Sequence, residues 1–114
     1  MNRYKLSKAG VNTEEGIQRL NGDKDLYESL LRRFCSSSYY EVLCKAVDEK
    51  KAKEAFESAH GMKGVAGNLG CTRLYKALLP LVEELRRESL DQAQELLAPV
   101  KEAYELLEKT VKSD

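Results

Sequence analysis

Apolar side chains recur every three or four residues through most of this 114-residue chain. That spacing gathers them on one face of an α-helix, whereas a half-buried strand would need strict alternation. The chain has only two prolines, and the helix-favouring residues leucine, alanine, glutamate and lysine are frequent. We therefore expect an all-α fold around one core, because a chain of this length forms a single domain.

Turn signals divide this helical pattern into segments. Asn21, Gly22 and Asp23 predict a helix end, a turn and the N-cap of a new helix. Ser89 and Gln92 have the spacing of a capping box and predict the start of the last helix. The expected helices span about residues 13–20, 23–47 with a bend or break at 36–38, 52–69, 72–87 and 89–112.

Four long amphipathic helices joined by short turns predict an antiparallel up-down four-helix bundle with a short extra N-terminal helix. We expect residues 1–114 to form a single domain, with 1–12 as an irregular segment and about 13–112 as the helical bundle. A monomer is the expected state, since the pattern indicates no large additional apolar face.

Charge and composition argue against several classes of function. Nineteen basic residues balance nineteen acidic ones, so we expect no nucleic-acid partner, which would require a basic face. No apolar run approaches the roughly 20 residues of a membrane span, and we expect a cytoplasmic protein or the cytoplasmic module of a larger sensor protein. Cys35 and Cys71 fall in or near apolar runs and are expected to be buried apolar residues rather than metal ligands.

The only histidine, His60, lies in a segment rich in glycine. A glycine inside a helix costs about 1 kcal/mol relative to alanine, so a function that requires glycine is expected here. Imidazole can titrate and react near neutral pH, which makes His60 the candidate reactive group. Four of the seven glycines follow it within ten residues: Gly61, Gly64, Gly67 and Gly70, the last a predicted helix cap.

Helical geometry predicts which residues share a face with His60. At about 100° per residue, Gly64 and Gly67 lie within about 40° of it and Lys63 lies about 60° away. We therefore expect an exposed strip of His60, Gly64 and Gly67, with Lys63 beside it and Phe56 at its rim. The apolar residues of the same helix point away from this strip: Ala55, Ala59, Met62, Ala66 and Leu69.

This arrangement suits acceptance of a phosphoryl group by His60. A neutral ring nitrogen can attack phosphorus, and Lys63 can offer positive charge to the phosphoryl oxygens. Gly64 and Gly67 remove side chains that would obstruct an approaching protein. The chain has no nucleotide-binding loop and no paired-carboxylate metal site near His60, so no cofactor of its own is expected, and a partner must supply the phosphoryl group and any Mg²⁺.

The segment around His60 resembles the histidine-containing phosphotransfer (HPt) domains of multistep two-component phosphorelays. The central motif of that family is roughly Ala-His-x-[Leu/Met]-Lys-Gly-x-[Ala/Ser]-x-x-[Leu/Ile]-Gly. Matching residues stand in register: Ala59, His60, Met62, Lys63, Gly64, Ala66, Leu69 and Gly70. An upstream segment from Gly10 to Leu31, and Leu74 and Leu81 downstream, also fit, so the resemblance covers about residues 10–87.

The resemblance implies that His60 is a phosphoacceptor exposed in the middle of its helix, with Lys63 and Gly64 supporting it. It implies that response-regulator receiver domains dock over this histidine and contribute their own aspartate and Mg²⁺, with sensor histidine kinases, including hybrid kinases, as further partners. The chain would then be a phosphocarrier rather than an enzyme. Gly61 departs from the threonine or serine often found there, and Val65 is bulkier than usual; Gly61 and Phe56 are candidate contacts at the docking rim.

Other functions are compatible with parts of this pattern. A module that binds receivers without transferring phosphoryl groups would use the same surface. A domain of the chemotaxis-kinase type would be phosphorylated at His60 directly by a histidine kinase. The phosphoacceptor helix of a sensor kinase fits less well, because Gly61 stands where those helices typically carry an acidic residue and no proline precedes Pro80.

Overall fold

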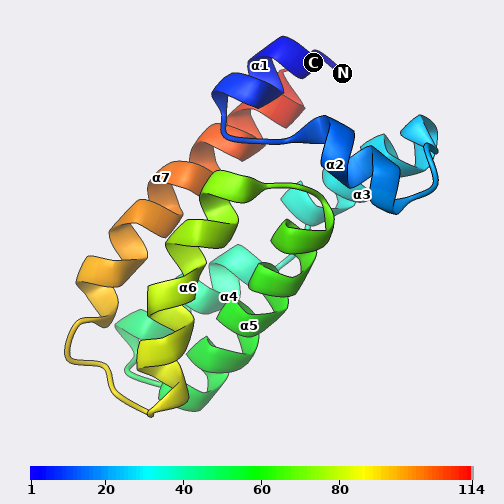
Figure 1. Cartoon of the computed structure of the whole chain (residues 1–114). Helices are drawn as coiled ribbons and strands as arrows, with labels where there is room; N and C mark the ends of the chain where they lie inside the picture. Colours follow the sequence, from blue (N-terminus) through cyan, green and yellow to red (C-terminus); the bar gives the residue numbers. More distant parts are fainter. Residues whose placement is uncertain (114) are drawn as a thin grey trace.

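Seven α-helices and no strands make up residues 1–113, the part of the chain that the computed structural model describes (Figure 1). The predicted all-α class is confirmed. The helices are α1 (Arg3–Lys8), α2 (Thr13–Arg19), α3 (Lys24–Cys35), α4 (Tyr39–Asp48), α5 (Ala52–Asn68), α6 (Thr72–Arg86) and α7 (Ala93–Lys112).

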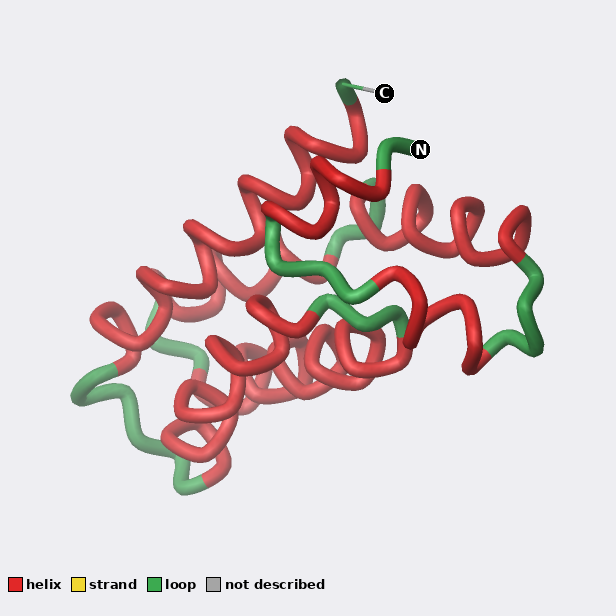
Figure 2. The backbone as a smooth tube through the Cα atoms, turned by 45° about the horizontal axis from the view of Figure 1, so that its top comes forward, coloured by secondary structure: helices red, strands yellow, loops and turns green. Residues whose placement is uncertain are grey.

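Helices α4 to α7 form a bundle in which successive helices run in opposite directions (Figures 1 and 2). Helix α5 packs between α4 and α6, α6 packs against α7, and α7 returns to α3 and α4. Each of the four helices buries large apolar side chains, and burying one leucine or methionine contributes about 1.5–3 kcal/mol. Those with no exposed surface include Leu43, Met62, Leu78 and Leu97.

The serine triplet breaks the long helix expected over residues 23–47 into α3 and α4. Ser36 follows the last residue of α3, and Ser38 precedes the first residue of α4. The Ser37 hydroxyl donates to the carbonyl oxygen of Phe34 at 2.7 Å, a local bond that competes with continued helix. Because the chain changes direction here, α2 and α3 lie at the end of the bundle where α5 ends (Figure 1).

Half of the segment expected to be irregular, residues 1–12, is a helix, which corrects the expectation from sequence in part. Residues 3–8 form α1, and the side chain of its N-cap, Asn2, accepts a hydrogen bond from the Lys5 N–H at 3.0 Å. Leu6 is only 2% exposed, and α1 packs against α7. A six-residue helix with one buried residue shows no periodicity, so the spacing of apolar residues could not predict it.

The prediction of a capping box before the last helix is also wrong. Helix α7 begins at Ala93, and its N-cap, Gln92, makes no side-chain capping bond. Instead, the Gln92 N–H donates to Oε2 of Glu84 at 2.8 Å. The accepting carboxylate belongs to a buried residue of α6. The Arg87 guanidinium donates to the other oxygen at 3.3 Å. These bonds, that of Gln92 foremost, hold the pKa of the Glu84 carboxyl below its usual range.

Glu84→Gln is expected to lower the thermal unfolding temperature at pH 7, because a neutral amide accepts a weaker bond from Gln92 than a carboxylate does. Because the pKa of Glu84 is lower in the folded protein than in the unfolded chain, its charge stabilises the fold at pH values above the unfolded pKa of roughly 4.3. This stabilisation is lost as the pH falls through the pKa of the folded state. Melting curves at neutral and acid pH should therefore show the variant and the wild type converging on acidification.

Glu83→Gln is the control for this prediction. Its side chain is 58% exposed on the same helix and pairs only with Arg86 among the described residues, so its removal should have a small effect at every pH. A stability difference for Glu84→Gln that does not change with pH would contradict the role assigned to its charge.

Candidate functional site

Helix α5 turns its small apolar residues inward and presents His60 to solvent. Ala55, Ala59, Met62 and Ala66 have no exposed surface, whereas the histidine is exposed. Alanines on the inner face let α5 approach α4 and α6 closely. The division of this helix into a buried and an exposed face, predicted from the spacing of its residues, is confirmed.

The His60 imidazole stacks on the ring of Phe56, one turn earlier in α5. The ring centroids lie 5.4 Å apart with 19° between the planes. The guanidinium carbon of Arg86, from α6, lies over the Phe56 ring at 5.1 Å from its centroid. Neither nitrogen of the imidazole is hydrogen-bonded to any residue in the described range 1–113, so both are accessible to a reaction partner.

Lys63 lies beside a hollow of about 510 Å³ between α2, α5 and α6. It is half-buried and forms no ion pair with the rest of the described chain, whereas Arg19 is paired with Glu15 at 3.3 Å. The Lys63 ammonium group is therefore available to an anion brought to His60. Other residues that line the hollow include Gly64 and Gly67 of α5, Tyr75 and Lys76 of α6 and the paired Glu15 and Arg19 of α2.

Of the two glycines predicted to clear the approach to His60, Gly64 leaves open space and Gly67 does not. A Cβ built at Gly64 would meet no heavy atom within 4 Å. A Cβ built at Gly67 would lie 3.1 Å from the ring of Tyr75 in α6, and Gly67 is half-buried. The expected clearance at Gly67 is therefore corrected: this glycine makes room for a tyrosine ring.

Gly61, expected at the docking rim, packs against Tyr39 of α4. A Cβ built at Gly61 would lie 2.6 Å from Cε1 of that ring, which is too close for any real side chain. The Ser58 hydroxyl donates to the carbonyl oxygen of Tyr39 at 2.7 Å and so joins α5 to α4 at the same level. Glycine therefore lets the Tyr39 ring lie against α5, and a threonine or serine here would have to displace that ring.

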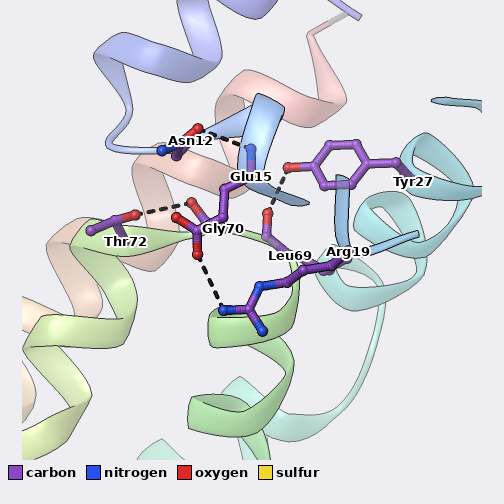
Figure 3. A network of polar contacts seen from close by, with 7 residues as sticks. All are labelled: Asn12, Glu15, Arg19, Tyr27, Leu69, Gly70 and Thr72. Carbon is purple, nitrogen blue, oxygen red and sulfur yellow. Dashed lines mark hydrogen bonds and ion pairs between the residues drawn. The ribbon is translucent and has the colours of Figure 1, made fainter. Parts of the chain in front are cut away.

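Gly70 ends α5 as predicted, with a φ of +72° that favours glycine. A Cβ there would overlap the carbonyl oxygen of Asn12, because the Asn12 N–H donates to the Gly70 carbonyl at 2.7 Å. Beside this contact, the Tyr27 hydroxyl donates to the Leu69 carbonyl at 2.7 Å (Figure 3). These bonds attach α2 and α3 to the C-terminal end of the helix that carries the imidazole.

Three residues that shape the site were missed from the sequence: Tyr39, Tyr75 and Arg86. Each lies on a neighbouring helix and reaches α5 only across a helix–helix contact. The two tyrosines cover glycines, and Arg86 contacts the aromatic ring on which the histidine stacks. No local pattern identifies such residues, because the periodicity of one helix contains no information on its neighbours.

Cys35 and Cys71 are buried free cysteines, as predicted. Burial raises the pKa of each thiol to about 12, so both stay protonated at neutral pH. Residues 1–113 contain no group of three or more His, Cys, Asp or Glu side chains arranged to hold a metal ion. Within the same range, no helix combines the length and the apolar character needed to cross a membrane.

Comparison with known proteins gave one match. A family model described as the Hpt domain matches residues 29–110. This range covers more than half of the chain and contains the whole motif around His60. No curated protein and no solved structure matches the chain.

Proposed function

Because this chain belongs to the Hpt domain family, whose members carry phosphoryl groups in two-component signalling, we propose that His60 is its phosphoacceptor. The chain relays a phosphoryl group between the aspartates of response-regulator receiver domains. The strongest support is that the His60 imidazole is exposed and has two nitrogens without hydrogen-bond partners in residues 1–113. A nucleophilic nitrogen requires that access.

In the transfer step, the lone pair of one His60 ring nitrogen forms a bond to phosphorus as the bond from phosphorus to the aspartyl oxygen breaks. The electron pair of the broken bond leaves with the aspartate, which becomes a carboxylate again. The other ring nitrogen keeps its proton, and the reverse step passes the phosphoryl group to the next receiver. The attacking and leaving atoms must lie in line, so the receiver has to approach His60 closely.

Lys63 supplies positive charge beside the transferred group in this mechanism. It shares the hollow next to Gly64 with Lys76, and a phosphoryl group brings negative charge that these two lysines can offset. We propose that Mg²⁺ is held by the receiver. Sensor histidine kinases, including hybrid kinases, stand upstream of the receivers, and the chain acts as a monomer in the cytoplasm.

Gly64→Leu is expected to slow phosphoryl transfer about tenfold or more, because a leucine would project from the bare helix surface one turn beyond His60. The rate at which label moves from a phosphorylated receiver measures this effect. Transfer at the wild-type rate would contradict docking of the receiver over this surface.

Gly64→Ala is the matched control for size. A methyl group at this position meets no neighbour within 4 Å, and alanine removes the helix cost of glycine. The free energy of unfolding in urea is therefore expected to rise by about 1 kcal/mol. An unstable Gly64→Ala would show that the surface is not open and would remove the basis of the leucine experiment.

A labelled receiver tests the proposed function directly. The purified chain is mixed with Mg²⁺ and a receiver that carries a radiolabelled phosphoryl group on its aspartate, and label that is acid-labile and alkali-stable is followed. Its appearance on the chain supports the relay. Receiver binding without label transfer would indicate a binding module instead, and labelling only by a histidine kinase with ATP would indicate direct phosphorylation.

A further inference from the structure

Within residues 1–113, no hydrogen bond orients the His60 imidazole. Its nitrogens have no partner in residues 1–113, and the side chain is exposed. An exposed side chain without such a bond ordinarily rotates freely. The contact that limits rotation here is the stack on Phe56, with centroids 5.4 Å apart and planes 19° apart.

Phe56 is itself held by two helices. Its half-buried side chain packs against the core from α5, and the Arg86 guanidinium of α6 lies over its ring at 5.1 Å. Arg86 in turn donates from Nε to Oε1 of Glu83 at 3.4 Å. A planar guanidinium over an aromatic ring is an attractive arrangement, so α6 adds a second restraint to a ring that already packs against the core.

We propose that Phe56 is a positioning residue that orients the His60 imidazole for in-line attack, with Arg86 and Glu83 holding the Phe56 ring in place. This inference rests on the proposed function, because orientation matters only if His60 reacts. Rates of phosphoryl transfer depend steeply on the alignment of the reacting atoms. A stack restrains the imidazole without occupying either nitrogen, whereas an orienting hydrogen bond would occupy one of them.

Phe56→Leu tests the proposal, because leucine keeps the apolar packing and removes the ring. With saturating phosphorylated receiver, the maximal transfer rate is expected to fall roughly three- to tenfold, as the energy of an aromatic pair implies. The receiver concentration that gives half the maximal rate should not change. Phe56→Tyr keeps the ring and is expected to restore the wild-type rate.

NMR spectroscopy measures the stack without any transfer reaction. The ring current of Phe56 displaces the resonances of the His60 ring protons, so Phe56→Leu should move them towards the positions of a free histidine and Phe56→Tyr should not. Tyr4→Leu is the matched control. Tyr4 is 68% exposed on α1 and has a cation over its ring, Lys8 at 5.0 Å, so its removal should change neither the resonances nor the rate.

A wild-type maximal rate in Phe56→Leu, shown by circular dichroism to be folded, would overturn the proposal, and so would unchanged His60 resonances. A higher half-saturating concentration at an unchanged maximal rate would assign Phe56 to receiver docking and also overturn it. If the wild-type chain accepts no label at all, the proposed function fails and the positioning role fails with it. Displaced His60 resonances in the wild-type chain would then show that the stack is present and that the phosphoacceptor role is what failed.

Discussion

His60→Gln is expected to accept no label from a phosphorylated receiver, a loss of at least about a thousandfold. The nitrogen of a glutamine side chain is conjugated with its carbonyl group and has no lone pair available for attack on phosphorus. The fold should persist, because the histidine is exposed and its nitrogens bond to nothing in residues 1–113. Loss of the stack on Phe56 should cost less than about 1 kcal/mol of unfolding free energy.

Receiver binding is the control for this variant. The surface around Gly64 is unchanged in His60→Gln, so calorimetric titration with an unphosphorylated receiver should show nearly the wild-type affinity. Acid-labile label on the variant would show that another residue accepts the phosphoryl group. Loss of binding together with label, in a protein with a normal melting curve, would mean that His60 serves docking rather than chemistry.

Gly70→Ala is expected to lower the free energy of unfolding by about 3 kcal/mol. An alanine at a φ of +72° costs about 1 kcal/mol. Its Cβ would also overlap the Asn12 carbonyl oxygen, and overpacking of this kind costs about 1–3 kcal/mol. Asn12 contributes backbone rather than a side-chain end and is bonded to Gly70 at 2.7 Å, so it cannot rotate away.

Gly22→Ala separates the two contributions. Gly22 also has a positive φ, +83°, but a Cβ there would meet nothing within 4 Å. This variant should lose only the conformational part, about 1 kcal/mol. Urea unfolding curves of both variants provide the comparison, and equal losses would contradict the close approach of Gly70 to Asn12.

The fold could be predicted as far as local signals extend. The spacing of apolar residues located the main helices, and Asp23 caps α3 as expected, with its carboxylate accepting from the Leu26 N–H at 3.0 Å. Helix α1 was missed because it packs against α7, at the other end of the chain, and no local pattern predicts that contact. The bond from the Gln92 N–H to the Glu84 carboxylate at the start of α7 was also missed. Glu84 lies eight residues earlier on another helix, outside the range of local capping patterns.

At the candidate site too, predictions that depend on one helix were confirmed, whereas contacts between helices were missed. The exposure of His60 and the burial of Ala59 and Met62 follow from positions on one helix, and both predictions are confirmed. The clearance expected at Gly67 was wrong because Tyr75 of α6 lies against this glycine. Gly61 packs against Tyr39 of α4, and its place at the docking rim stays a prediction. That His60 accepts a phosphoryl group, with help from Lys63, stays a prediction for the transfer assay.

By itself, the sequence determined that His60 stands on the solvent side of an amphipathic helix, because the direction of a side chain around a helix depends only on its position along it. Tertiary structure decided which glycines of that helix are bare, since only the packing of neighbouring helices leaves Gly64 open and covers Gly61 and Gly67. It also decided what restrains the imidazole, because the Arg86 side chain meets Phe56 only when α6 lies against α5.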